Sequence, residues 1–147
     1  MEREREVIDR IREFNRFYTI ALGMLNRRFL DSEFSVTETR ILFELSVSDH
    51  CTANFLTEKL HIDKSYLSRI LHSFERRGLV AKRISPEDGR AFLIDLTDRG
   101  RQEASRLIER TNKQIGELIA PLSGEERARL CRAMDVVTEY LGGGKRQ

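Results

Sequence analysis

Residues 52–96 read TANFLTEKLHIDKSYLSRILHSFERRGLVAKRISPEDGRAFLIDL, and this stretch is the most informative part of the 147-residue chain. Thr52 is a suitable N-cap for a short helix, and the residues that follow Leu60 form a turn. Asp63 then caps a longer helix, which Gly78 ends as a residue in the left-handed conformation. The apolar side chains of this longer helix recur at the spacing of one buried face, namely Leu67, Ile70, Leu71 and Phe74.

The residues after Gly78 predict a ribbon of two strands, at 79–84 and 91–96. In the second strand, Phe92, Ile94 and Leu96 occupy alternate positions, which is the period of a half-buried strand. The segment between the strands, SPEDGR, is rich in turn-forming residues. Helix, turn, helix and ribbon in this order form the layout of a winged helix-turn-helix, which is a DNA-reading module.

A long amphipathic helix is predicted over residues 5–30, before this motif. Its apolar side chains recur every three or four residues, at Val7, Ile11, Phe14, Tyr18, Ala21, Leu25 and Phe29. A stripe this broad must cover another element or another subunit. Ser35 then opens a second helix through a capping box with Glu38. The buried face of that helix is expected to consist of Ile41, Leu42 and Leu45.

Two further helices are predicted after the ribbon. Thr97 caps a helix over roughly residues 98–120, and Pro121 ends it. Ser123 and Glu126 form a capping box that opens the last helix. The apolar stripes of the two helices are Ala104, Leu107, Ile108, Thr111, Ile115 and Leu118, and then Leu130, Met134, Val137 and Leu141.

These patterns predict a mainly α fold with a small β-wing. The terminal helices carry more apolar surface than so thin a monomer buries, so we expect a homodimer whose two winged modules read two half-sites. The expected parts are an N-terminal dimerisation helix in residues 1–34, the winged helix-turn-helix lobe in 35–97, C-terminal dimerisation helices in 98–141 and a flexible tail in 142–147.

The composition narrows the class of protein. Charged residues make up 34% of the chain and hydrophobic residues 39%, which is typical of a soluble, helix-rich protein. Apolar runs stay far below the ~20 residues that a membrane span needs. The N-terminus, MEREREVIDR, lacks the apolar centre of a signal peptide. We therefore expect a cytoplasmic protein with no membrane partner.

Catalytic and metal chemistry are not predicted. The cysteines, Cys51 and Cys131, lie far apart without a CxxC pattern, so we expect two buried free thiols rather than a metal site. The three histidines, His50, His61 and His72, have no matching nucleophile or ligand cluster. The sequence thus predicts no enzyme, no catalytic residue, no metal and no cofactor.

Double-stranded DNA is the predicted partner, because the motif carries a basic face. Residues 61–90 hold seven Lys or Arg against four Asp or Glu, although the net charge of the whole chain is only +2. On the longer helix, the side chains opposite the buried face are expected to touch bases and phosphates, and they include Lys64, Ser65, Tyr66, Ser68, Arg69, His72 and Arg76. For this helix taken alone, an ordinary solvated surface is the alternative.

The flanks of the motif add further predicted DNA contacts. Arg90 at the ribbon tip is expected to enter the minor groove, with Asp88 holding its guanidinium group. Arg83 faces either phosphate or solvent, as does the neighbouring lysine. Thr52 and Asn54 are placed to donate to phosphate from the start of the short helix.

Three stretches together resemble the MarR family of regulators, namely TANFLTEKL, DKSYLSRILHSFERRGLV and SPEDGRAFLIDLTDRG. The resemblance covers about residues 5–141, and the D-x-R of the family's wing matches Asp88 and Arg90. It implies a homodimeric transcription factor that binds a near-palindromic operator, usually as a repressor. It also implies a small, often phenolic or anionic, effector between the dimerisation helices and the DNA-binding lobe. The implied ligand-binding residues here are Phe14, Tyr18 and Arg40.

One branch of the family senses peroxides through a cysteine in the N-terminal helix. This chain has no cysteine before Cys51, so that mechanism is not predicted.

A second resemblance is to proteins that fuse a MarR-like module to a GNAT acetyltransferase. The N-terminal half of those proteins is similar to three stretches of this chain, IREFNRFYTIALGMLN, YLSRILHSFERRGLV and SPEDGRAFLIDLT. The alternatives are therefore the DNA-binding or regulatory part of a bifunctional acetyltransferase, or a dimeric small-molecule binder whose winged domain does not touch DNA.

Overall fold

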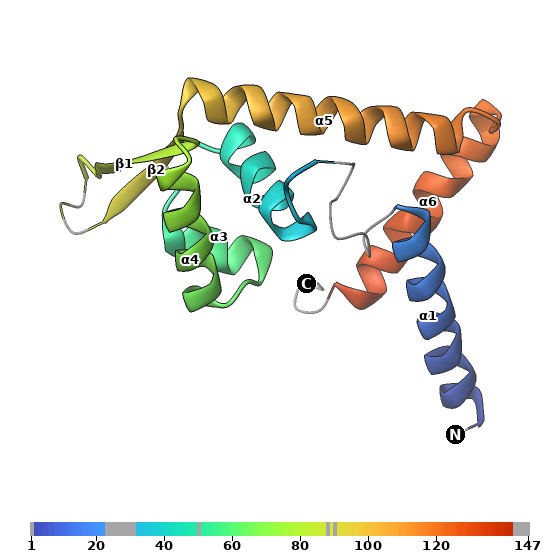
Figure 1. Cartoon of the computed structure of the whole chain (residues 1–147). Coiled ribbons are helices and arrows are strands. Elements are labelled where there is room, and N and C mark those ends of the chain that lie inside the picture. The colour runs from blue at the N-terminus through green and yellow to red at the C-terminus, as the bar shows by residue number, and fades with distance from the viewer. Residues whose placement is uncertain (1, 23–31, 50, 88, 90, 143–147) are drawn as a thin grey trace. The chain divides into compact units, whose positions relative to one another are not determined.

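The computed structural model describes residues 2–22, 32–49, 51–87, 89 and 91–142. In chain order, the described elements are α1 (Glu2–Ala21), α2 (Val36–Val47), α3 (Ala53–Leu60), α4 (Lys64–Arg76), β1 (Val80–Ile84), β2 (Phe92–Leu96), α5 (Asp98–Ile119) and α6 (Gly124–Leu141) (Figure 1). This architecture confirms the predicted mainly α fold with a small β-ribbon. Residues 1–111 and 112–147 form two compact units.

The helices begin where the sequence provides caps. Ser35 and Glu38 form both bonds of a capping box at the start of α2, and Ser123 and Glu126 do the same for α6. The side-chain oxygen of Thr52 accepts the Phe55 N–H at 3.0 Å and so begins α3. These side chains satisfy backbone donors that have no partner within the helix, which is why the predicted starts are confirmed.

The core lies in the first unit, between α2, α3, α4, the ribbon and the first turns of α5. Every apolar position predicted to be buried on α2 and α4 is buried. Other members of the core include Phe34, Leu56, Leu79, Val80, Ile94, Leu96, Ala104 and Leu107. The loop before α3 joins this core through a bridge in which the Ile94 N–H donates to the Cys51 carbonyl at 2.8 Å.

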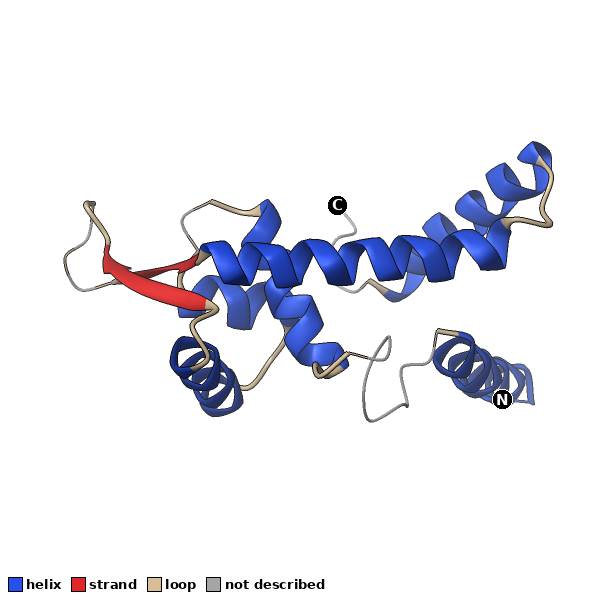
Figure 2. Ribbon diagram, turned by 45° about the horizontal axis from the view of Figure 1, so that its top comes forward, coloured by secondary structure: helices blue, strands red, loops and turns tan. Residues whose placement is uncertain are grey.

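The two strands pair antiparallel in a two-stranded sheet, drawn in red in Figure 2, with Ile84 opposite Phe92. The predicted alternation along β2 is only partly right, because Phe92 is exposed and Leu93 is buried. Phe92 lies at the outer end of the ribbon, away from Leu96 and the core beneath it. Leu93 is buried outside the main core cluster. Strict alternation of buried and exposed residues is therefore a wrong prediction at the outer end of β2.

The terminal helices differ from the core lobe in exposure. The helix predicted over 5–30 is described as α1 to Ala21, and residues 23–31 lie outside the described part of the chain. The apolar stripe of α1 is exposed at Val7, Ile11 and Phe14, and α6 buries none of its residues. Cys131 on α6 is exposed, so the prediction of two buried thiols is correct only for Cys51. Within the described residues, every helix is too short or too polar to span a lipid bilayer.

Candidate DNA-binding surface

Helix α4 is divided sharply into a buried face and a polar face. Leu67, Ile70, Leu71 and Phe74 anchor it in the core, and the predicted DNA-facing side chains of Lys64, Ser65, Tyr66, Ser68, Arg69, His72 and Arg76 are all exposed. On this face the Arg69 guanidinium lies over the Tyr66 ring, 5.8 Å from its centroid. Such a cation–π contact restricts the arginine before any ligand arrives. The helix thus presents hydroxyl, phenol and guanidinium groups from a rigid base.

A tight turn sets α4 against α3. His61 has a left-handed backbone with φ of 53°, and Asp63 then accepts the Tyr66 N–H at 3.1 Å to begin α4. At the start of α3, the Thr52 oxygen is occupied by its capping bond, and Asn54 is exposed. The predicted helix-turn-helix geometry is therefore present in the described chain.

The ribbon holds its two described cations in ion pairs. Arg83 donates from Nε to the Asp95 carboxylate across the strands at 2.6 Å. Lys82 Nζ lies 3.7 Å from Glu75 of α4. The sequence offered phosphate or solvent as the partner of Arg83 and missed Asp95, because the two residues come together only through strand pairing. Asp88 and Arg90, the predicted tip contacts, lie outside the described residues.

The C-terminal end of α4 is closed by a Schellman motif. Gly78 adopts φ of 74°, its N–H donates to the Glu75 carbonyl, and the Leu79 N–H donates to the Phe74 carbonyl at 2.8 Å. The Thr97 hydroxyl then donates to the Gly78 carbonyl at 2.6 Å and accepts the Gly100 N–H at 3.1 Å. The end of α4 and the start of α5 are therefore fastened to each other.

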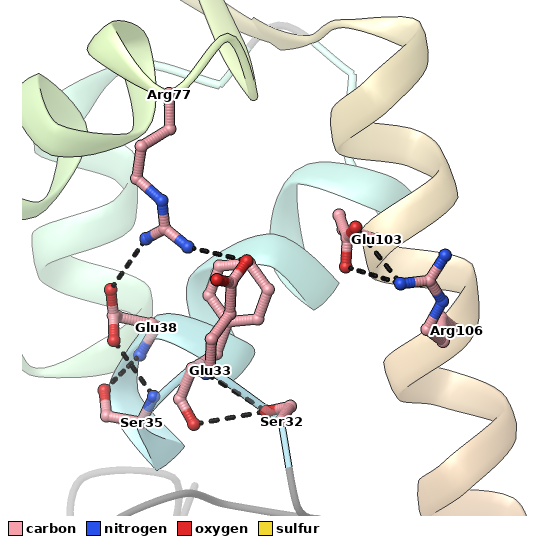
Figure 3. A network of polar contacts seen from close by, with 8 residues as sticks. Ser32, Glu33, Ser35, Glu38, Arg77, Glu103 and Arg106 are labelled. Carbon is pink, nitrogen blue, oxygen red and sulfur yellow. Dashed lines mark hydrogen bonds and ion pairs between the residues drawn. The ribbon is translucent and has the colours of Figure 1, made fainter.

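A cluster around Arg77 joins α4 to the segment before α2, and the sequence patterns did not reveal it. Figure 3 shows the Arg77 guanidinium between two carboxylates, 3.0 Å from Glu33 and 3.6 Å from Glu38. The same group lies over the rings of Phe34 and Phe74, at 4.7 and 5.9 Å from their centroids. These residues are called the Arg77 cluster below. They are distant in sequence, so periodicity has no means of finding them.

A pocket of about 320 Å³ opens beside this cluster. Its lining consists of Ser32, Glu33, Phe34, Glu103, Arg106, Leu107 and Arg110. The predicted ligand-binding residues are not among those that line this pocket. Phe14 and Tyr18 stack on each other along α1, with their ring centroids 5.5 Å apart, and Arg40 is exposed on α2. Groups of three or more His, Cys, Asp or Glu suited to a metal ion do not occur within the described ranges.

This arrangement of helices and ribbon is the winged helix-turn-helix fold. The sequence pattern of the MarR family matches residues 32–91 of this chain. The uncharacterized HTH-type transcriptional regulator YdgJ of Bacillus subtilis (strain 168) is 32% identical over 93 residues. The match spans 63% of this chain and just over half, 57%, of that relative.

Solved structures share the fold over most of the chain. The PcaV transcriptional regulator from Streptomyces coelicolor is 25% identical to this chain, with a TM-score of 0.69. The match covers 90% of this chain and 96% of the PcaV chain. PcaV was also solved in complex with its natural ligand. A mutant of MarR from E. coli, complexed with operator DNA, has a TM-score of 0.73 at 22% identity, with coverage of 90% and 95%. These likenesses establish the fold of the described chain.

Proposed function

We propose that the protein is a sequence-specific DNA-binding transcriptional regulator that acts as a repressor on a near-palindromic operator. The observation that carries this proposal is the division of α4, whose predicted DNA-facing side chains are exposed while its opposite face fixes it in the core. A helix presented in this way fits the major groove, where arginine side chains pair with guanine edges and phosphates.

Each part of the surface has a proposed role in binding. Tyr66 and Arg69 read base edges, and the cation–π contact between them limits the entropy lost on binding. Phosphate contacts are assigned to Lys64, Ser65, Ser68, His72, Arg76, Thr52, Asn54 and Arg83. Arg90 enters the minor groove with Asp88 beside it. Arg83 contacts phosphate only while it also faces Asp95, so we expect its contribution to be smaller than that of Arg69.

The proposed active form is a homodimer. In the single chain, α1 and α6 leave large apolar side chains in contact with water, among them Phe14, Phe17, Met134, Val137 and Tyr140. Exposed apolar surface of this extent marks an interface. The proposed dimerisation segments are residues 1–34 and 98–141, which leave the lobe of residues 35–97 free to bind a half-site.

We further propose that a small anionic effector regulates the protein. The pocket beside α2 carries Arg106 and Arg110 on its α5 wall, and guanidinium groups suit a carboxylate or phenolate. Arg106 pairs with Glu103 of the same lining at 3.3 Å, so an anionic effector would compete with that carboxylate. Phe14, Tyr18 and Arg40 remain proposed effector contacts from α1 and α2. PcaV, which shares the fold, binds a natural ligand.

Selection of genomic fragments bound by the protein at near-physiological salt tests the function. We expect enrichment of an inverted repeat whose half-site centres lie about 10 base pairs apart. Binding should weaken steeply as salt rises, since each neutralised phosphate releases counterions. A folded protein that enriches no sequence would contradict the proposal.

Two alternatives remain distinguishable. The first alternative, the regulatory part of a bifunctional acetyltransferase, rests on the sequence resemblance alone. A reading frame that continues past Gln147 into a GNAT-like domain would favour it. Effector binding without any DNA binding would favour a small-molecule binder.

A further inference from the structure

Two residues connect the proposed effector pocket with the end of the recognition helix. Glu33 and Phe34 line the pocket, and both also contact Arg77, the C-cap residue of α4. Glu33 and Phe34 thus form part of the pocket lining and also contact the side chain of Arg77; the ion pair between Arg77 and Glu33 is drawn in Figure 3. A change in charge at Glu33 therefore alters an ion pair of Arg77.

Arginine is suited to this position for a physical reason. Its planar guanidinium group donates in several directions and stacks on aromatic rings at the same time, which lysine cannot do. Here it meets two carboxylates and two rings, and its side chain is 32% exposed. The hydrogen bonds of the Schellman motif join the backbone around Arg77 to the last turn of α4. The contacts of the Arg77 side chain therefore act on that turn through the backbone.

The two carboxylates are not equivalent. Glu38 is tied into the capping box of α2, and its side chain is 21% exposed. Glu33 makes the shorter contact with Arg77, 3.0 Å, yet its side chain is 65% exposed. Glu38 is therefore the fixed arm of the cluster, and Glu33 is the arm that responds to the contents of the pocket.

We propose that Arg77 is a positioning residue for DNA recognition and that Glu33 makes this positioning sensitive to the charge of the pocket. The proposal rests on the proposed DNA-binding function. An anion that displaces Glu103 from Arg106 brings negative charge beside the Glu33 carboxylate, repels it and competes for Arg77. Arg77 then loses the shorter of its two ion pairs, and the last turn of α4, which follows the buried anchor Phe74, is held less firmly.

A double-mutant cycle tests this coupling without a known effector. The variants are Glu33→Gln, Arg77→Met and the double variant, and the readout is fluorescence anisotropy with the selected operator duplex. We expect Glu33→Gln to weaken binding by about threefold to tenfold and to have no further effect once Arg77 is replaced. The melting temperature of Glu33→Gln should stay close to that of the wild type, because Glu33 is largely exposed.

The matched control is Glu109→Gln, which removes the same charge from an exposed side chain of α5 that does not line the pocket. Removing a negative charge by itself favours binding to DNA, so Glu109→Gln should bind as tightly as the wild type or slightly more tightly. Loss of affinity in Glu33→Gln would have the opposite sign. Equal behaviour of the two variants, or equal losses with and without Arg77, would overturn the proposal.

Amide hydrogen exchange gives a second readout that is independent of DNA. The Leu79 N–H, which closes the Schellman motif, should exchange faster in Glu33→Gln than in Glu109→Gln. Unchanged exchange in both variants would show that Glu33 does not hold the end of α4. A wild-type protein that binds no DNA would contradict the proposed function, whereas this exchange measurement would still decide the role of Glu33.

Discussion

Gly100 fixes the junction between α4 and α5 at the scale of a single residue. A Cβ at this position would overlap the backbone carbonyl oxygen of Leu79. The close approach is what allows Thr97 to bridge Gly78 and the first turn of α5. A Gly100→Ala substitution should therefore destabilise the lobe by about 1–3 kcal/mol, measured by urea unfolding. The control Gly116→Ala adds a Cβ in open space on the same helix and should be neutral or stabilising by up to ~1 kcal/mol.

The buried thiol of Cys51 should make the stability of the lobe depend on pH. Burial, together with the nearby carboxylates of Glu44, Asp95 and Asp49, raises the pKa of Cys51 above its ordinary value of 9.0. The folded state then holds the thiol proton up to a higher pH than the unfolded state does. The free energy of unfolding therefore has its full value below about pH 9 and decreases as the pH rises further. Urea unfolding between pH 7 and 10 should show this decline in the wild type but not in Cys51→Ala. Parallel pH curves for the two proteins would exclude the effect.

At the scale of elements, the predictability of each part depended on how local its causes are. Helix α4 could be predicted in detail, since its caps and its buried face follow from neighbouring residues. The ribbon was harder, because the burial of Leu93 and the exposure of Phe92 depend on where the lobe ends. The pair of Arg83 and Asp95 and the Arg77 cluster arise only from tertiary packing, so the sequence patterns gave no sign of them.

The polar face of α4 yields a prediction for specificity. Arg69→Ala removes a group assigned to base edges, so it should change the preferred half-site and cost about 1–3 kcal/mol at one base position. Repeating the fragment selection with the variant measures this change. Lys113→Ala removes an exposed cation on α5 and should leave the preferred sequence intact. If Arg69→Ala enriches the same half-site as the wild type, α4 does not read sequence through this residue.

At the scale of the whole molecule, the proposed homodimer would let two half-sites be read at once, and we expect the terminal helices to hold it together. On α6, Leu130, Met134 and Val137 lie on one side of the helix and are exposed in the single chain. A Val137→Glu substitution places a charge within the proposed interface, where it has no partner, and should weaken self-association by at least about tenfold. Sedimentation equilibrium would show monomers, and operator binding would fall because each lobe then binds its half-site alone. Arg132→Glu puts the same charge on the opposite side of α6 and should remain dimeric, so dissociation of both variants, or of neither, would locate the dimer interface elsewhere.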